Sequence, residues 1–161
     1  LRDALNPEGR GRREIRMGAF ILREGDKVMQ IRNNYDKMVF NGDIGRVVKA
    51  DPEEQEVVVA FDESDGLRRV TYEQHELDEL VLSYAISVHK SQGSEFPIVI
   101  MPVSWFPPML ATRNLLYTAV TRAKDAVILV GSEDKMRAMV DNNSIVERYS
   151  GLEPKLKEFL L

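Results

Sequence analysis

Four residues that could bind a nucleotide, Gln92-Gly93-Ser94-Glu95, precede an apolar run that is typical of a buried strand. They offer a side-chain amide, a glycine whose backbone a ligand can approach closely, a hydroxyl and a carboxylate. Neutral donors beside one acceptor suit the phosphate edge and the ribose hydroxyls of a nucleotide. α/β proteins place their ligand sites at the ends of strands and helices. A helix that ends around Gly93 explains the glycine equally well, so both interpretations stay open.

Hydrogen-bonding side chains also alternate just upstream, at Ser87, His89 and Ser91, and Lys90 adds a positive charge. Hydroxyl and imidazole groups with no carboxylate among them can donate to phosphodiester oxygens. Such contacts position a nucleic-acid strand without reading its sequence. The alternative for the lone histidine is a structural hydrogen bond.

An amphipathic helix is predicted over residues 114–124, with Arg122 near its end. Its apolar stripe consists of Leu116, Ala119, Val120 and Ala123. A guanidinium at this place can bind phosphate oxygens through its planar fork. It can also simply favour the negative end of the helix dipole.

The elements that would position these groups alternate between strand and helix after residue 80. The expected strands cover 81–85, 98–103 and 126–130, with a helical turn at 87–91 and helices at 111–124, at 133–141 and from about 154. Such alternation predicts an α/β fold, a parallel sheet with covering helices.

Between residues 34 and 80 the pattern changes to short strands and frequent turns, typical of a small antiparallel barrel of SH3-like size. Asn41-Gly42 predicts a type I′ hairpin turn. Earlier segments, 15–22 and 27–32, have strand-like composition with a turn at 23–26. We therefore expect one α/β domain made of 1–33 and 81–161, interrupted by a β insertion at 34–80 whose ends lie close together.

Composition sets limits on partners and setting. The chain has 161 residues, 43% of them hydrophobic, no cysteine and two histidines, so a disulfide framework or a metal site is not expected. A net charge of −4 argues against nonspecific nucleic-acid binding through bulk charge. Seven acids and no base lie in 51–65, which is typical of a solvated face. No apolar run approaches the roughly 20 residues that span a bilayer, so we expect no membrane partner and a cytoplasmic setting.

The wording His-Lys-Ser-Gln-Gly-Ser-Glu-Phe (89–96) and Leu-Tyr-Thr-Ala-Val-Thr-Arg-Ala (116–123) closely resembles motifs V and VI of superfamily 1 helicases, in their RecD branch (exodeoxyribonuclease V alpha-chain type). The resemblance implies a RecA-like second motor domain. It assigns Gln92, Gly93 and Glu95 to the bound ATP, and Arg122 to the γ-phosphate as an arginine finger. It assigns single-stranded DNA contacts to four residues, Ser87, His89, Lys90 and Ser91.

Residues 33–36 and 40–45 also recur in RecD-like proteins, around and inside an SH3-like insertion. Tyr35 and Phe40 could stack on bases. They could equally close the core of the small barrel, which is the interpretation that we favour here. Leu5-Asn6-Pro7 resembles the tail of motif IV, a much shorter match.

The chain contains no Gly-x-x-x-x-Gly-Lys-[Ser/Thr] motif and no evident acidic Walker B strand. By resemblance these belong to a first RecA-like domain that would precede residue 1. The chain is then expected to be the later part of an ATP-dependent 5′ to 3′ DNA helicase or translocase, inactive by itself. Mg²⁺ and ATP would be held chiefly by that missing domain, and other nuclease-helicase subunits are further candidate partners. The alternative is a non-enzymatic nucleic-acid or protein-binding module on a RecA-like shell.

Overall fold

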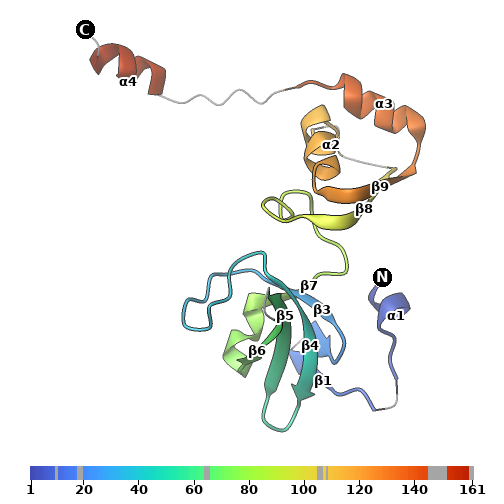
Figure 1. Cartoon of the computed structure of the whole chain (residues 1–161), viewed down its shortest axis with the longest axis vertical. Helices are drawn as coiled ribbons and strands as arrows, with labels where there is room; N and C mark the ends of the chain where they lie inside the picture. Colours follow the sequence, from blue (N-terminus) through green and yellow to red (C-terminus); the bar gives the residue numbers. More distant parts are fainter. Residues whose placement is uncertain are drawn as a thin grey trace. The chain divides into compact units, whose positions relative to one another are not determined.

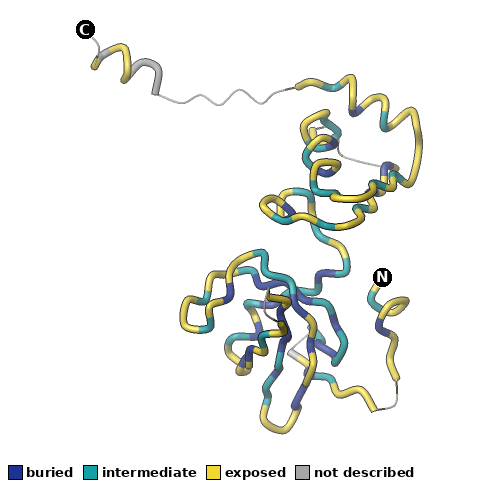
Figure 2. The backbone as a smooth tube through the Cα atoms, in the orientation of Figure 1, coloured by how far each residue is buried: buried dark blue, intermediate teal, exposed yellow. Residues whose placement is uncertain are grey.

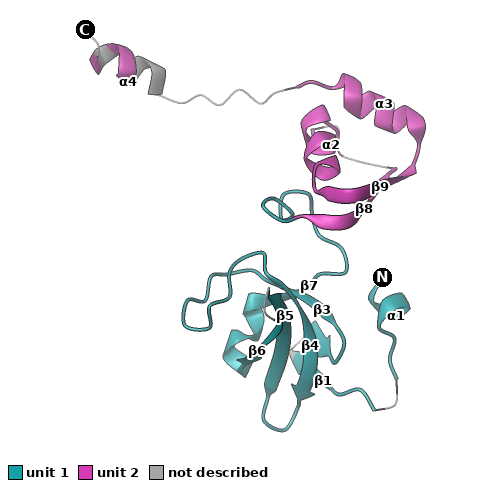
Figure 3. Ribbon diagram, viewed as in Figure 1, with its two compact units in different colours: residues 1–94 teal, residues 95–161 magenta. Residues whose placement is uncertain are grey.

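The chain folds as two compact units, residues 1–94 and residues 95–161 (Figure 3). The computed structural model describes residues 1–9, 11–17, 20–63, 66–104, 107, 109–144 and 152–159.

The first unit is built on a five-stranded antiparallel sheet with the strand order β6-β5-β4-β3-β7 (Figure 1). Its strands are β3 (Lys27–Gln30), β4 (Ile44–Asp51), β5 (Glu56–Glu63), β6 (Gly66–Tyr72) and β7 (Leu80–Leu82). A short helix, α1 (Arg2–Leu5), and a hairpin of β1 (Glu14–Met17) and β2 (Phe20–Arg23) precede the sheet, and a 3-10 helix, η1 (Gln74–Glu79), joins β6 to β7. The predicted turn at 23–26 is confirmed, because the Asp26 amide donates to the Arg23 carbonyl at 2.9 Å.

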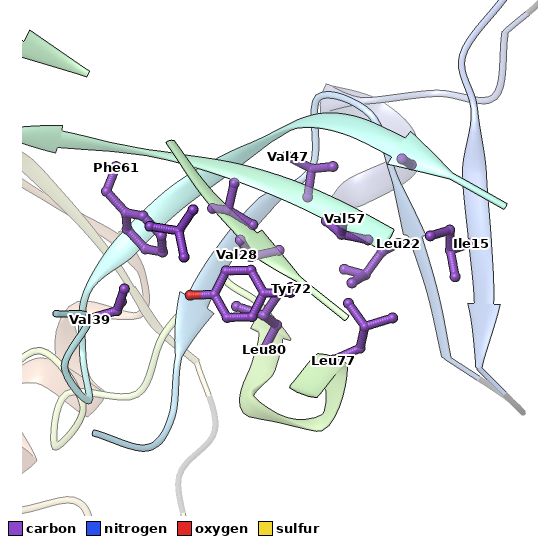
Figure 4. Packing of buried hydrophobic residues seen from close by; sticks show 13 residues of the cluster. Ile15, Leu22, Val28, Val39, Val47, Val57, Phe61, Tyr72, Leu77 and Leu80 are labelled. Carbon is purple, nitrogen blue, oxygen red and sulfur yellow. The ribbon is translucent and has the colours of Figure 1, made fainter. Parts of the chain in front are cut away.

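One apolar core joins the strands and η1 of this unit (Figure 4). The alternation of β5 turns Val57, Val59 and Phe61 to the same side of the sheet. Leu77 of η1 is also completely buried in this core. The other members are Ile15, Leu22, Val28, Val39, Val47, Ala50, Val70, Tyr72 and Leu80. Strands from before residue 34 and from the 34–80 segment therefore share a single core.

Strand β7 corrects one prediction. The sequence places a strand of the parallel sheet at 81–85, but β7 covers Leu80–Leu82 and pairs antiparallel with β3. Leu80 lies opposite Gln30, and the Ile31 amide donates to the Glu79 carbonyl at 2.8 Å. These pairs bring the two ends of the 34–80 segment together. Strand–helix alternation does not reveal which sheet a three-residue strand joins, and the domain bounds given above stay a prediction.

The Asn41-Gly42 turn has a different type from the predicted one. The Asp43 amide donates to the Phe40 carbonyl at 3.0 Å, so a turn is present. Only Gly42, with φ of 102°, takes a positive value, whereas type I′ needs two such residues. One positive φ at the third position is typical of a type II turn. The reason is that residues 31–43 form a longer connection between β3 and β4 than a two-residue hairpin loop.

The second unit contains a parallel strand pair joined by a helix. Its elements are β8 (Phe96–Val103), α2 (Arg113–Val120), β9 (Ala123–Gly131), α3 (Glu133–Asp141) and α4 (Leu152–Phe159). Met101 and Val103 of β8 are buried, as are Leu116 and Ala119 of α2 and Met139 of α3. The predicted order of strand, helix, strand and helix is confirmed. Helix α2 was predicted to reach residue 124, but it ends at Val120, and 123–124 begin β9 instead.

Gly131 ends β9 opposite Val103, at the end of the β8–β9 pair. Its φ is 148°, and a Cβ atom built there would lie 2.0 Å from the carbonyl oxygen of Val103. The Ser132 amide donates to that same oxygen at 2.9 Å. Only glycine fits this close approach.

We predict that Leu77→Ala lowers the free energy of unfolding of the first unit by about 2–5 kcal/mol, because it leaves a cavity in the shared core. Leu67→Ala is the matched control, since Leu67 is 65% exposed. Urea denaturation followed by circular dichroism measures both variants. Equal effects of the two substitutions would contradict the placement of Leu77 in the core.

Candidate functional site

Residues 87–94 form consecutive turns after β7. The Ser91 amide donates to the Ser87 carbonyl at 3.1 Å, which closes the predicted helical turn. The Ser94 amide continues the series by donating to the Ser91 carbonyl at 3.1 Å. The Ser87 hydroxyl accepts from the Lys90 amide at 3.3 Å and so caps the first turn. The sequence from Ser87 onward therefore folds locally, through its own backbone and short-range side-chain hydrogen bonds.

The four predicted DNA-contacting side chains divide into two kinds. Ser87, His89 and Lys90 are exposed on the turn. Ser91 is 7% exposed, and its hydroxyl donates to the Val88 carbonyl at 2.7 Å. Ser91 thus holds the turn together, whereas the other three present donors to solvent.

Gly93 has a φ of 84°, a conformation that side-chain-bearing residues rarely adopt. No atom lies within 4 Å of the place where a Cβ atom would stand. A glycine that ends a helical turn takes this conformation, so the capping interpretation accounts for the residue. The open space also leaves its backbone, next to the exposed Gln92, accessible to a ligand.

In the second unit, the chain brings Glu95 close to the segment around Arg122. The Phe96 amide donates to the Arg122 carbonyl at 2.8 Å. The Glu95 carboxylate pairs with the Lys124 ammonium at 3.2 Å, and both side chains are more than half exposed. The Arg122 guanidinium donates to the Thr121 hydroxyl at 3.4 Å. Two residues from distant parts of the sequence, Glu95 and Arg122, therefore lie at neighbouring strand starts.

The structure corrects two expectations, one about Arg122 and one about the helix before it. It was predicted near the end of a helix, but it lies in the turn between α2 and β9. Leu116 and Ala119 of the predicted stripe are buried, whereas Val120 is 39% exposed and Ala123 belongs to β9. Open α/β sheets bind ligands beyond the carboxyl ends of their strands. Glu95 and Arg122 instead lie at the amino ends, because α2 returns the chain to that edge.

The core interpretation of Tyr35 and Phe40 was wrong. The Tyr35 side chain is 70% exposed and that of Phe40 is 39% exposed. The two rings form an edge-to-face pair with centroids 5.9 Å apart. Val39 between them enters the core instead, since its backbone pairs with Asn34 in an isolated bridge.

A buried polar network that the sequence does not reveal precedes the turn. The Asp26 carboxylate is completely buried and accepts from the Arg2 guanidinium at 2.7 Å and from the Asn6 amide at 2.8 Å. It also accepts from the Tyr84 hydroxyl at 2.8 Å. Burial and this carboxylate raise the pKa of the Tyr84 phenol. The resemblance of Leu5-Asn6-Pro7 to motif IV was the only signal, and it did not identify Asp26 as the partner.

Two family models match the chain. The SH3 domain of ATP-dependent RecD-like DNA helicases matches residues 1–61, and the C-terminal domain of UvrD-like helicases matches residues 82–130. An ATP-dependent RecD2 DNA helicase from Deinococcus radiodurans is 37% identical over 132 residues, 82% of this chain. The chain belongs to the RecD-like helicase family. The resemblance found in motifs V and VI is confirmed.

Another RecD protein and a helicase of known structure are also similar to this chain. The RecBCD enzyme subunit RecD of Mycolicibacterium smegmatis is 34% identical over 138 residues, 83% of this chain. The chain spans 17% of the Deinococcus relative and 22% of the Mycolicibacterium one. A solved Bacteroides Pif1 bound to single-stranded DNA aligns with a TM-score of 0.56 at 20% identity, over 97% of this chain and 41% of that one. This likeness shows the fold, and the predicted α/β class with an SH3-like segment is confirmed.

Taken one by one, the candidate residues carry groups of the kinds that bind nucleotides. The exposed Gly93 backbone and the Arg122 guanidinium suit phosphate, and the Glu95 carboxylate suits sugar hydroxyls. Within the described part of the chain, no group of three or more His, Cys, Asp and Glu side chains could hold a metal ion.

The described helices include none that is long and apolar enough to cross a membrane.

We predict that Tyr84→Phe lowers the free energy of unfolding of the first unit by about 1–2 kcal/mol, through loss of the hydrogen bond to Asp26. The folded state raises the pKa of Tyr84 above 10.0, so the stabilisation is complete below that pH and is lost as pH rises through the folded pKa. The stability difference between the two proteins should therefore shrink above pH 10.

Urea titrations over a pH series measure this difference. The control is Tyr35→Phe, which changes an exposed phenol. A difference that stays constant up to strongly alkaline pH would contradict the assigned partner.

Proposed function

We propose that the chain is the later motor part of an ATP-dependent 5′ to 3′ DNA helicase of RecD type. In this role it supplies an arginine finger and contacts to single-stranded DNA. One observation carries the proposal: the bond from the Phe96 amide to the Arg122 carbonyl joins motif V to motif VI. The two motifs are far apart in sequence, and β8, α2 and β9 are the elements that bring them together.

Gln92, Gly93 and Glu95 are proposed to contact bound ATP. The Gly93 backbone is open, so a phosphate oxygen can approach its amide closely. The Glu95 carboxylate, exposed beside Lys124, can accept from ribose hydroxyls. The name of the Deinococcus relative includes ATP dependence, which supports this nucleotide. Mg²⁺ would be held by a first RecA-like domain of the same protein and would neutralise charge on the phosphates.

Arg122 is proposed to act on the γ-phosphoryl group during its transfer. A planar guanidinium binds two phosphate oxygens at once and stabilises charge that develops as the phosphoryl group leaves. Its position in a tight turn supports the role, because the backbone on both sides is held, by α2 before it and by β9 after it. The backbone that carries the side chain is therefore ordered before a phosphate group binds.

Ser87, His89 and Lys90 are proposed to hold the phosphodiester backbone of single-stranded DNA. All three are exposed on one turn, which Ser91 closes from inside. Contacts of this kind hold any strand regardless of sequence, as a translocating motor requires. The Bacteroides Pif1 with a similar fold is bound to single-stranded DNA, which supports this class of partner.

An apolar sheet face supports a larger motor around this chain. Ile98, Ile100, Ile128 and Val130 are each at least 47% exposed and alternate with residues turned toward the helices. Parallel strands are normally covered on both faces. We propose that further parts of the motor cover this face, and that the first RecA-like domain adjoins the nucleotide. One relative is a subunit of the RecBCD enzyme. We therefore also propose other nuclease-helicase subunits as partners, in the cytoplasm.

We predict that Arg122→Lys in the full-length helicase lowers ATP turnover at least about a hundredfold, with near-normal nucleotide binding. Lysine keeps the charge but loses the planar fork, and an arginine finger acts mainly in the transition state. Steady-state ATPase assays with single-stranded DNA measure the effect. Arg137→Lys, in the exposed Glu133–Arg137 pair of α3, is the matched control. Turnover within a few-fold of the unmodified enzyme would remove the finger assignment.

Replacing both Ser87 and His89 by alanine should weaken single-stranded DNA binding about tenfold, because two phosphate contacts are lost. DNA-stimulated ATPase should fall while ATP binding is preserved. Fluorescence anisotropy with oligothymidine at several salt concentrations measures the change. His75→Ala, an exposed histidine on η1, serves as the control. Unchanged affinity at every salt concentration would assign both residues a structural role.

A further inference from the structure

The loop between β3 and β4, residues 31–43, is exposed over much of its length (Figure 2). Met38 is 59% exposed, beside the exposed Tyr35–Phe40 ring pair. Met38 also has a φ of 53°, which is unfavourable for a residue with a side chain. Exposed apolar groups and backbone in an unfavourable conformation both mark candidate binding surfaces.

Charged side chains hold this loop in place. The Arg68 guanidinium donates to the carbonyls of Lys37 and Met38 at 2.6 and 2.8 Å, and it pairs with Glu63. The Lys37 ammonium donates to the Thr71 carbonyl at 2.6 Å and pairs with Glu76. The loop is therefore tied to β6 and η1, and Met38 and Phe40 are held outside the core. A binding surface that is ordered beforehand loses less entropy when a partner arrives.

Between this loop and the ends of β5 and β6 lies an open pocket of about 440 Å³. Its apolar lining includes Met38, Phe40, Ile44 and Phe61. Its charged lining consists of three carboxylates, Asp43, Asp62 and Glu63, and one guanidinium, Arg68, which leaves a net charge of −2. Arg68 forms an ion pair with Glu63. Asp62 is exposed, and it forms no ion pair with any residue in the described part of the chain. The pocket thus combines an apolar wall and an aromatic ring with excess negative charge.

We propose that this pocket binds an arginine or lysine side chain from an extended segment of a partner protein. The long aliphatic stem of such a side chain packs on the exposed Met38 and the half-exposed Ile44 while its head stays polar. Its cationic head meets Asp62 and the face of Phe40. The phosphates of a nucleic acid are disfavoured here, because the surrounding carboxylates repel them. The inference does not depend on the proposed motor function.

Binding of a short peptide tests the proposal. The probe is acetyl-Arg-Pro-Leu-Pro-Arg-Leu-amide, in which proline favours an extended chain, and its counterpart carries glutamate at both arginine positions. Each is titrated into the isotope-labelled chain at low ionic strength, and backbone amide shifts are followed by nuclear magnetic resonance. We expect saturable shifts around Phe40, Asp62 and Arg68 with a Kd of about 10 μM to 1 mM, and none with the glutamate peptide.

Three variants locate the binding. Asp62→Lys and Phe40→Ala should each weaken peptide binding at least about tenfold, since each removes one of the two interactions with the cationic head. Glu54→Lys changes net charge by the same amount as Asp62→Lys, but it lies in the turn at the opposite end of the β4–β5 hairpin. It should leave binding unchanged. Amide spectra of all variants report whether each remains folded.

Other results would overturn the proposal. Absence of saturable shifts with the arginine peptide excludes a site for cationic side chains. Equal weakening by Glu54→Lys means that bulk charge drives binding. If oligothymidine shifts the same amides, and does so more strongly with Asp62→Lys, the exposed aromatic pair serves nucleic acid instead.

Discussion

The arrangement of the first unit depends on the hydrogen bonds that the buried carboxylate of Asp26 accepts. Removing a charged group from water is costly unless hydrogen bonds and an opposite charge compensate for it. Here the compensation comes from Arg2 and Asn6 at the start of the chain and from Tyr84 after β7. The Asp26 backbone also joins β4, because its carbonyl accepts from the Val47 amide at 2.9 Å. Segments separated by more than fifty residues in sequence, such as 26 and 84, are thus fixed to one point.

This network ties the segment that leads into the motif V turn to the SH3-like sheet. Tyr84 precedes Ser87 by three residues, so the anchor for the turn lies inside the antiparallel unit. Networks of this kind in a low-dielectric interior reinforce each other's hydrogen bonds.

Much of the fold could be predicted because local patterns determine it. Short apolar runs identified β8 and β9, and the motif wording identified the family. The errors arise where tertiary contacts decide. The pairing of β7 with β3 could not be predicted, because Gln30 and Leu80 are far apart in sequence and become neighbours only in the folded chain. Val39 is buried and its neighbour Phe40 exposed, owing to a backbone bridge that composition cannot reveal. The acceptor role of Asp26 depends on three partners that lie far away in sequence. Among the site residues, the structure brings Glu95 close to Arg122, whereas the chemical roles of both rest on resemblance.

Gly131 has a consequence for how this part of the protein can vary in evolution. The position excludes every other side chain, because even a methyl group would overlap the Val103 carbonyl oxygen. A missense change in this codon would force the carboxyl ends of β8 and β9 apart, at the edge opposite Glu95 and Arg122. Such a change would leave the sequences of motifs V and VI intact and still weaken the strand pair that carries them. A protein of this family can therefore carry complete motifs V and VI on a domain that does not fold correctly. The presence of the motifs alone does not show that the protein is active.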